Sequence, residues 1–591
     1  MNINFCLIKK RVMTASPCHH VILKSLPMGV LGLALLTSCA DWNDHYDADT
    51  SLLSSQHATL WDNIQSNAEL SQFASLLKKV GYDEILNTTQ TYTVWAPKNG
   101  SFDFDVINAL SNIRLQKEFV ENHIARSNFP VSGSVNQRVY TLNEKHMNFT
   151  GAGQYAIQNV GVAQSNLASS NGVIHVIDGK IPFMANIYEA LTPNDYPLDS
   201  ISEFFHSYDV KKLNERKSVQ GPTVNGEITY LDSVFDEHND LFTRYFAYIN
   251  REDSNYTMLV PTNDAWQKAR EAISPYFNYV HSFEFMENTS TGTDQKKITV
   301  NIRNLDYLRD SVINQMLMND LFYNNNLYDN RKLNALQTGQ QLNVDSLYST
   351  TLTKIYSEDA RRLFENARRV EMSNGAIWVT DSLRMRPWTT WNPEIIVEAE
   401  HVNTLSSTAF VAENGPERVN VVSGTQNPEV RGHVSNNSFI ELTPISQSTN
   451  PRVVFYLPEV RSTTYSIYVV VVPANIVSST REAKPYQFNA TLGCADASGK
   501  NQDKENKWLV ESSFISDPTR VDTIYLGDFT FPVAYAGTGD YYPYLRINSS
   551  VANKERDLFD RTLRIDCVIL RPKELDNYLK EHPDYKYDVR L

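Results

Sequence analysis

The sequence of 591 residues is short of cysteine, of positive charge and of long hydrophobic runs. Its five cysteines are too few for a disulfide framework in a chain of this length. Acidic residues outnumber basic ones by 68 to 54, whereas a nucleic-acid-binding protein needs basic residues to neutralise phosphates. We therefore expect no nucleic-acid partner. The single apolar stretch that bears on a membrane lies at the N-terminus.

Local motifs of catalysis and cofactor binding are missing as well. The sequence contains no His-Glu-x-x-His, no Cys-x-x-Cys, no Gly-x-x-x-x-Gly-Lys and no Gly-x-Ser-x-Gly. Carboxylates are plentiful, so a glycosidase pair is not excluded, but no local motif indicates one. We expect a non-enzymatic protein without an organic cofactor.

What the sequence does contain is enough apolar material for several packed cores. Hydrophobic residues make up 41% of the chain and aromatic residues 11%, which excludes wholesale disorder. A chain of this length divides into roughly three to five domains of ordinary size.

The first 39 residues are typical of a secretory leader. They carry four basic residues and no acidic one, and an apolar run from Val30 to Leu36 precedes Thr37, Ser38 and Cys39. The segment Leu36-Thr37-Ser38-Cys39 resembles a bacterial lipobox. The resemblance implies a signal peptide over residues 1–38 and a lipid on Cys39, which would anchor the chain in a membrane. Translation could also start at Met13.

An acidic segment follows the predicted lipidation site. Asp41, Asp44, Asp47 and Asp49 lie in the stretch 39–55. This stretch resembles the signal that sends lipoproteins of Bacteroidetes to the outer cell surface, and it also fits a solvated tether. The resemblance implies a lipid-anchored protein exposed on the outer membrane.

The next region begins with a helical period and continues into a buried strand. Apolar residues recur at spacings of three and four from Leu60 to Val80, Gly81 ends that pattern, and Thr91–Pro97 reads as a strand. Three blocks in this order resemble the fasciclin-type domain: Leu60-Trp61-Asp62-Asn63-Ile64 with Tyr92-Thr93-Val94-Trp95-Ala96-Pro97, then Phe119-Val120-Glu121-Asn122-His123-Ile124, then Asn171-Gly172-Val173-Ile174-His175-Val176-Ile177-Asp178. We expect His123 to be a packing residue, and His175 and Asp178 to be satisfied locally rather than to bind a ligand.

The same pattern then recurs with longer spacing. Tyr256–Trp266 repeats the strand block and Ser373–Asp381 repeats the closing block, so a second fasciclin-type domain is expected. Insertions are predicted near 215–250, 268–305 and 325–360. Asn319-Asp320-Leu321 takes the place of Asn122-His123-Ile124, so the histidine of the first copy is an aspartate in the second.

Beyond Trp391, eight short strand signals separated by Gly, Pro and Asn predict a two-sheet sandwich. Its first and last strands, Ile396–Glu400 and Leu563–Leu570, resemble those of carbohydrate-binding jelly rolls. That resemblance implies a structural calcium held by Glu398, Glu400 and Asp566. Alternation places the two glutamates on one face of the strand, and exposed carboxylates on a polar face are the alternative.

A tyrosine cluster in this third region has two interpretations. Tyr535, Tyr541, Tyr542 and Tyr544 surround Asp540 and could form an aromatic platform for a sugar, or be an ordinary tyrosine-rich loop. Cys494 and Cys567 could pair or remain free thiols.

The predicted class is α+β: two fasciclin-type domains followed by an all-β, jelly-roll-like sandwich. In order, the predicted parts are a signal peptide (1–38), an acidic tether (39–55), fasciclin-type domain 1 (56–192), fasciclin-type domain 2 with insertions (193–390) and the sandwich (391–591). The expected function is binding or adhesion at the cell surface, as an accessory to glycan or peptide capture by a SusC/SusD-type outer-membrane system. The alternatives are a carbohydrate-active enzyme with its site in the sandwich, and a structural spacer.

Overall fold

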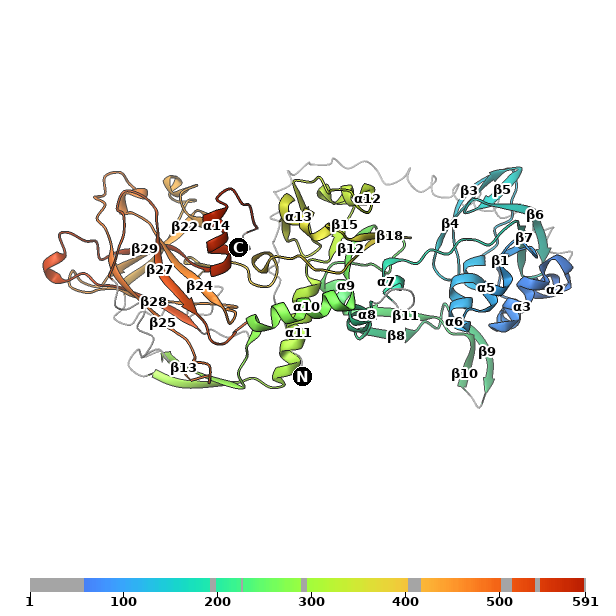
Figure 1. The fold of residues 1–591 in the computed structure, drawn as a ribbon, viewed down its shortest axis with the longest axis horizontal. Helices are drawn as coiled ribbons and strands as arrows, with labels where there is room; N and C mark the ends of the chain where they lie inside the picture. Colours follow the sequence, from blue (N-terminus) through green and yellow to red (C-terminus); the bar gives the residue numbers. More distant parts are fainter. Residues whose placement is uncertain are drawn as a thin grey trace, which may run out of the picture. The chain divides into compact units, whose positions relative to one another are not determined.

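The computed structural model describes residues 58–191, 198–224, 227–288, 295–401, 416–500, 513–536 and 543–588. The chain divides into two compact units between Phe183 and Met184 (Figure 1). The predicted leader, the acidic tether and Cys39 lie outside the described residues. Within the described ranges, no helix has both the length and the apolar character needed to cross a membrane.

The first unit opens with helices that bury one apolar side. Thr59 caps the first helix through a reciprocal pair of hydrogen bonds with Asp62. Gly81 has φ 79° where the third helical segment has ended, as the sequence predicted. The helical elements are α2 (Leu60–Ser66), η1 (Ala68–Leu70), α3 (Ser71–Lys79), α4 (Tyr82–Ile85), α5 (Phe104–Asn108), α6 (Asn112–Arg114), η2 (Leu115–Val120) and η3 (Glu121–His123).

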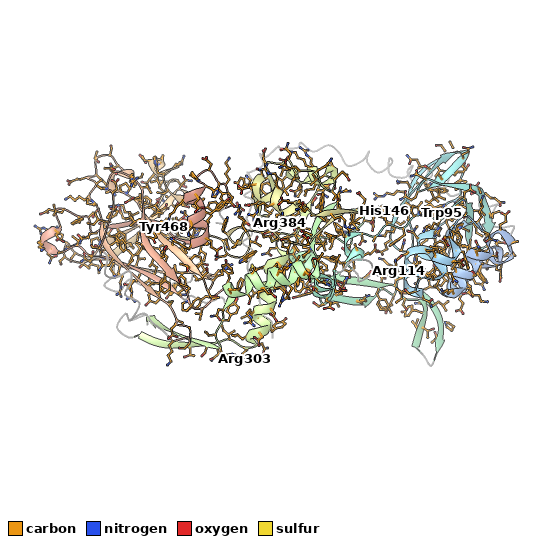
Figure 2. All side chains as sticks on the ribbon, viewed as in Figure 1. Trp95, Arg114, His146, Arg303, Arg384 and Tyr468 are labelled. Carbon is orange, nitrogen blue, oxygen red and sulfur yellow. The ribbon has the colours of Figure 1, made fainter. Side chains whose placement is uncertain are left out.

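A seven-stranded sheet with the order β2-β1-β7-β6-β5-β4-β3 forms the rest of this unit. Its central strands β1 and β7 run parallel and are buried along their whole length. Trp95 of β1 is labelled in Figure 2. Its ring packs against those of Phe149 and His175. The strands are β1 (Tyr92–Pro97), β2 (Ile124–Arg126), β3 (Ser134–Tyr140), β4 (His146–Ala152), β5 (Gln154–Ile157), β6 (Val160–Ser169) and β7 (Gly172–Ile177).

The second unit begins with a smaller sheet of the order β15-β12-β19-β18. Its strand β12 pairs antiparallel with β15 and parallel with β19, which is the pattern of β1 with β2 and β7. The strands are β12 (Tyr256–Pro261), β15 (Phe322–Asn324), β18 (Arg368–Met372) and β19 (Gly375–Thr380). The helical elements of this part are α7 (Ile187–Ala190), α8 (Asp199–His206), α9 (Asp240–Arg244), α10 (Asn263–Ile273), η4 (Ser274–Phe277), α11 (Leu305–Met318), η5 (Tyr328–Arg331), α12 (Lys332–Ala335), α13 (Ser357–Phe364) and η6 (Pro387–Thr389).

In the first unit, an Asn-Gly pair joins the central parallel strands to the opening helix. The side-chain oxygen of Asn171 accepts from the N–H of Leu60 at 2.8 Å, and its amide donates to the carbonyls of Leu86 and Thr88. Gly172 has φ +150°, and a Cβ there would lie 1.9 Å from the carbonyl oxygen of Tyr92. The glycine is therefore required by close approach of the parallel strand.

The second unit repeats this arrangement. Asn374 accepts from the N–H of Ile187 at 2.9 Å and donates to the carbonyls of Ile249 and Arg251. Gly375 has φ +137° and lies equally close to the paired strand. Helix α7 holds the place that α2 holds in the first unit, and the second unit starts at Met184.

Two-stranded hairpins occupy the three regions where insertions were predicted. Each is paired on itself and stays outside the four-stranded sheet. They are β8 (Asp209–Leu213) with β11 (Phe235–Asn239), β9 (Val219–Val224) with β10 (Glu227–Asp232), β13 (Ser282–Asn288) with β14 (Gln295–Asn301), and β16 (Ser346–Tyr348) with β17 (Lys354–Tyr356).

Two antiparallel sheets with one shared apolar core make up the C-terminal part of this unit. The larger sheet has the order β21-β22-β29-β24-β27, and β20 also pairs with β29. Its strands are β20 (Ile395–Glu398), β21 (Pro416–Ser423), β22 (Ser438–Pro444), β24 (Thr464–Val471), β27 (Asp522–Thr530) and β29 (Leu563–Pro572). The smaller sheet has the order β23-β28-β25-β26, formed by β23 (Arg452–Tyr456), β28 (Tyr544–Ser549), β25 (Gln487–Gly493) and β26 (Phe514–Ile515).

Short helical elements complete this part: η7 (Pro428–Val430), η8 (Ser435–Asn437), η9 (Ala474–Ile476), η10 (Asn553–Glu555) and α14 (Lys573–Glu581). Helix α14 and the residues after it connect the larger sheet to the preceding part of the unit. Asp576 accepts from the hydroxyls of Ser466 and Tyr468 on β24. Arg386 bonds to Asp359 at 2.8 Å and lies over the rings of Trp388, Tyr578 and Tyr585.

Candidate site: a buried carboxylate cluster

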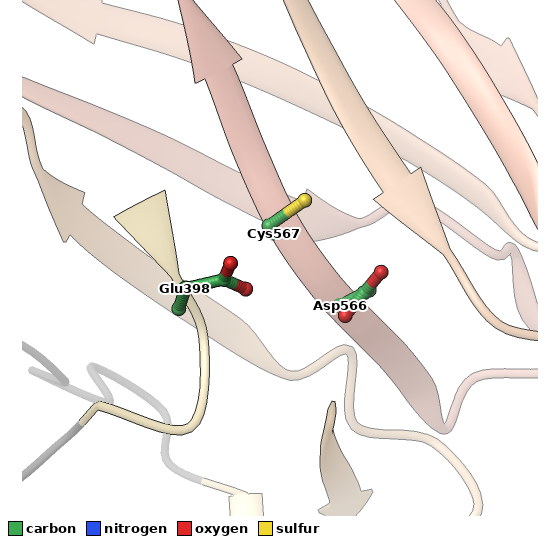
Figure 3. A group of neighbouring side chains, drawn as sticks. All are labelled: Glu398, Asp566 and Cys567. Atoms are coloured by element: carbon green, nitrogen blue, oxygen red, sulfur yellow. The ribbon is translucent and has the colours of Figure 1, made fainter. Parts of the chain in front are cut away.

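Two carboxylates and a thiol lie together where the first strand of the larger sheet meets its last strand, and a third carboxylate, Glu400, is near enough to raise the pKa of Asp566. Glu398 ends β20, Glu400 follows two residues later, and Asp566 lies in β29. Figure 3 shows the Glu398 carboxylate directed from the end of its strand toward the strand that carries Asp566 and Cys567. One ligand atom each from Glu398, Asp566 and Cys567 lies within 4.8 Å of the others. The structure thus brings Glu398 and Asp566 together, with Cys567 rather than Glu400 as the third member of this group.

Glu398 faces away from the core shared by the two sheets. Ile395, Val397 and Ala399 belong to that core, so alternation turns Glu398 and Glu400 to the opposite face. The segment around η8 covers this face at the cluster. The hydroxyl of Ser435 donates to Glu398 at 2.5 Å, and its N–H donates to Asp566 at 3.0 Å.

A β-bulge brings Asp566 to the same place. Val470 of β24 pairs with Cys567 while the next residue, Val471, pairs with Ile565, which leaves Asp566 as one extra residue in β29. Such an extra residue re-aims its side chain out of the regular alternation. Without the bulge, Asp566 would point to the face opposite Cys567, and Cys567 is the residue that pairs with Glu398.

Several oxygens of the cluster are buried without a hydrogen bond. They are one carboxylate oxygen of Glu398, one of Asp566 and both of Glu400. Glu398 is 6% exposed and Asp566 3% exposed. Buried carboxylate oxygens normally have partners, so an arrangement of this kind calls for a compensating cation or bound protons.

The pKa values of the cluster are raised for the same reason. Burial raises the pKa of Asp566 to about 7; the Ser435 N–H offsets part of the rise, and the charges of Glu398 and Glu400 add to it. Burial raises the pKa of Glu400 to about 7 as well, although its own N–H and the Asn436 amide approach closely enough to offset part of the rise. Burial also raises the pKa of Glu398. At neutral pH the cluster therefore binds either protons or a cation.

The chemistry of the donors fits a hard divalent cation. Ca²⁺ takes carboxylate and carbonyl oxygens, and the three carboxylates supply six oxygens from three positions in the sequence. Burial, together with the charges of Asp566 and Glu398, raises the pKa of the Cys567 thiol. A soft metal would have to bind this thiol as a thiolate, whereas Ca²⁺ uses the carboxylate oxygens, so the larger number of oxygens favours Ca²⁺.

Two tyrosines of the predicted sugar platform, Tyr535 and Tyr544, are buried in the structure. Tyr535 is 2% exposed, and its hydroxyl accepts from the N–H of Ala495 at 3.0 Å. Tyr544 is 5% exposed and its ring lies against Gly493, where an added Cβ would meet the ring at 2.3 Å. Both are core residues, whereas a stacking platform needs an exposed ring face. Asp540, Tyr541 and Tyr542 lie outside the described residues.

The histidines of the first unit are packing residues. Nε2 of His123 accepts from the N–H of Ile181 at 2.9 Å, so Nδ1 carries the proton and donates to the Phe119 carbonyl. Burial lowers the pKa of both His123 and His175 to about 4, which keeps them neutral. Asp178 forms an ion pair with Lys98.

The sequence left two features of the cluster unpredicted. Ser435 belongs to a short helical turn that no strand or motif signal marks, and the bulge at Asp566 lies inside an apolar run that reads as a regular strand. An acidic residue in the middle of the buried strand Leu563–Leu570 was the one available signal. Cys494 and Cys567 are both buried, and the structure has no disulfide between them.

Comparison with known proteins identifies one family. Residues 68–181 match the Fasciclin domain, so the chain contains a fasciclin domain in its first unit. No curated protein matches the chain.

Three solved structures resemble the chain at low identity. A FAS1 domain pair from the insect cell adhesion molecule fasciclin I is 15% identical, covers 55% of this chain and 99% of its own, and has a TM-score of 0.19. The GH26-CBM35 β-(1,4)-mannanase of Podospora anserina is 10% identical, with coverage of 30% and 27% and a TM-score of 0.17. A Paenibacillus xanthan lyase is 11% identical, with coverage of 40% and 18% and a TM-score of 0.19. We draw no functional conclusion from TM-scores of this size.

Proposed function

We propose that the chain is a lipid-anchored protein of a bacterial outer-membrane surface, with an origin in Bacteroidetes, that binds or adheres without catalysis. The fasciclin domain of residues 68–181 carries this proposal, because fasciclin domains are associated with cell adhesion and surface binding. The lipobox-like segment ending at Cys39 supports the anchor. Several acyl chains on one residue would give stable attachment.

We further infer that residues 184–390 are a second, diverged fasciclin-type domain. The repeated strand order and the repeated Asn-Gly arrangement at Asn374 support this. For residues 391–591 we infer a carbohydrate-binding-like jelly roll, supported by two sheets around one core and by the pairing of β20 with β29. In this view the protein is an accessory to glycan or peptide capture by a SusC/SusD-type system.

We also propose that Glu398, Glu400 and Asp566 hold a structural Ca²⁺. The buried carboxylate oxygens without hydrogen-bond partners support this. Bound calcium would supply the compensating charge, while the carboxylates would hold the end of β20 against β29 and the Ser435 turn.

Cell fractionation tests the anchor. Cys39→Ala should release the protein from membranes, whereas Cys18→Ala, a cysteine substitution within the leader but outside the lipobox, should leave it anchored. Retention of the Cys39→Ala protein on membranes after a high-salt wash would refute the lipid anchor.

Co-purification tests the capture role. The solubilised wild-type protein should bring down an outer-membrane transporter. If it brings down none, and no glycan or peptide shifts its melting temperature, the spacer function is favoured instead. Turnover of a polysaccharide that one carboxylate substitution abolishes would favour the enzyme.

A further inference from the structure

A shallow depression lies on the second unit, in one of the regions where an insertion was predicted. It has a volume of about 420 Å³ and is lined by Asn326, Tyr328, Asp329, Arg331, Ser346 and Tyr348. One side of the depression is formed by the turn η5 and by Asn326, which precedes it; the other side is formed by strand β16. The two sides are about twenty residues apart in the sequence. The volume lies in the range of small-ligand sites, about 300–1,000 Å³.

Two stacked tyrosines form one wall of the depression. The ring centroids of Tyr328 and Tyr348 are 4.3 Å apart with an interplanar angle of 28°. Tyr328 is 57% exposed, so its ring offers a surface to solvent. It also has φ 52°, a conformation that bulky residues rarely adopt and that clusters at functional sites. An exposed aromatic ring held in this way stacks against the C–H face of a pyranose.

A buried asparagine holds the two sides of the depression together. Asn330, 1% exposed, donates to the carbonyls of Asn324 and Tyr348 and accepts from the N–H of Tyr348 at 3.0 Å. The turn that carries Tyr328 is therefore fixed to the strand that carries Tyr348. Such preorganisation lowers the entropy lost on binding a ligand.

The charges at the depression favour an acidic ligand. Asp329 lies 3.7 Å from the ammonium group of Lys332, which balances it. Arg331 forms no ion pair within the described part of the chain. A second cation, Lys354, lies with its ammonium group 5.7 Å from the Tyr348 ring centroid. A guanidinium group binds a carboxylate through two parallel hydrogen bonds.

We infer that this depression binds a uronic acid residue of an acidic glycan. Tyr328 stacks on the pyranose ring, Arg331 binds its carboxylate, and the polar side chains of Asn326 and Ser346 face the hydroxyl groups. This inference rests on the proposed function of ligand capture, and it adds the site and the chemical class of the ligand.

Calorimetric titration of the full chain tests the inference. The ligands are tetrasaccharides of galacturonate and of mannuronate, with neutral galactotetraose as the comparison. The buffer contains no calcium, so the carboxylate cluster and calcium bridging do not contribute. We expect an acidic tetrasaccharide to bind at least about tenfold more tightly than the neutral one.

Substitutions then assign the binding to the depression. Tyr328→Ala and Arg331→Gln should each weaken binding at least about tenfold. Tyr328→Gly, which removes the ring and relieves the positive φ, should do the same in a chain that melts normally. Tyr307→Ala is the matched control, because Tyr307 is an exposed tyrosine on α11, 73% exposed.

Three outcomes would overturn the inference: equal binding of acidic and neutral tetrasaccharides, no binding of either acid, or unchanged affinity in Tyr328→Gly and Arg331→Gln. The proposed function is tested separately on cells and by co-purification. A chain that stays anchored and captures another ligand would therefore refute the uronate site alone.

Discussion

Calcium should stabilise the second unit, because the cluster of Glu398, Glu400 and Asp566 has buried carboxylate oxygens without hydrogen-bond partners in the described part of the chain. Raising the pKa of Asp566 from 3.8 to about 7 corresponds to about 4 kcal/mol for ionising that one buried carboxylate. The three groups interact, so their individual values do not add. Calcium at about 100 times its dissociation constant would add about 2.7 kcal/mol to the free energy of unfolding. For a C-terminal part of about 200 residues, this corresponds to a rise in melting temperature of roughly 5–10 °C.

The pH dependence has a definite sign. The folded protein holds protons on Asp566 and Glu400 up to about pH 7, whereas the unfolded chain releases them near pH 4. In EDTA, the unfolding free energy should therefore fall as pH rises from about 4 to about 7, and it should stay at the lower value above pH 7. Calcium binds the ionised carboxylates, so its stabilising effect should grow as pH rises through 7.

Differential scanning calorimetry at pH 5 and pH 8, with calcium or with EDTA, measures both effects. Asp566→Asn should remove most of the calcium response, and Asp557→Asn, at an exposed aspartate, should keep it. Zinc should stabilise less than calcium, since the ligands are oxygens. An unchanged melting temperature on adding calcium at pH 8 would refute the reasoning, as would a full calcium response in Asp566→Asn.

Three further predictions concern stability. Arg386→Ala should lower the unfolding free energy by about 3 kcal/mol in denaturant titration, because the substitution leaves the carboxylate of Asp359, 6% exposed, without its closest cation. Arg386→Lys keeps a cation there and should lower the unfolding free energy less. Equal decreases in the two variants would contradict a stabilising ion pair. Gly172→Ala should destabilise the first unit by more than about 2 kcal/mol, since the new Cβ meets a backbone oxygen at 1.9 Å, whereas Gly100→Ala, with open space around it, should cost about 1 kcal/mol. Burial lowers the pKa of His123 to about 4, so the first unit should become less stable as pH falls from about 6.5 to about 4, because His123 binds a proton more readily in the unfolded chain. Hydrogen exchange of the strands of the first unit should show this loss of stability. Exchange protection that does not change with pH would contradict the prediction.

Much of the C-terminal architecture could be predicted from short-range patterns. The eight strand signals beyond Trp391 correspond to β20, β22, β23, β24, β25, β27, β28 and β29. The missed elements have weak local signals: β26 has two residues, β21 begins at Pro416, and α14 follows directly after the long strand β29. Helix α14 has nine residues and buries only Leu575 and Asp576, so it is a short segment in which most residues are charged or polar.

The candidate site was predictable only in part, because some of its residues are placed by their own strand and others by the pairing of strands that are far apart in the sequence. Alternation along one strand was sufficient to place Glu398 and Glu400 on one face. The position of Asp566 depends on a bulge that appears only in the register between β29 and β24. Composition left the role of Tyr535 open, because a tyrosine-rich loop has the same composition whether its rings are buried or exposed; in the structure the Tyr535 ring is buried.

The two units share one local arrangement and differ in the elements around it. Both use the same Asn-Gly pair at the start of the central parallel strand, because a side-chain amide must join three backbone groups and no Cβ fits beside the facing carbonyl. The histidine after the preceding helix is not needed in both, since the second unit has Asp320 at the corresponding place. Hairpins inserted in the second unit pair only with themselves and leave the four-stranded sheet undisturbed. Such insertions are free to carry exposed rings and charges, so the specificity of binding is expected in the hairpin region of Tyr328 and Tyr348 rather than in the shared sheet.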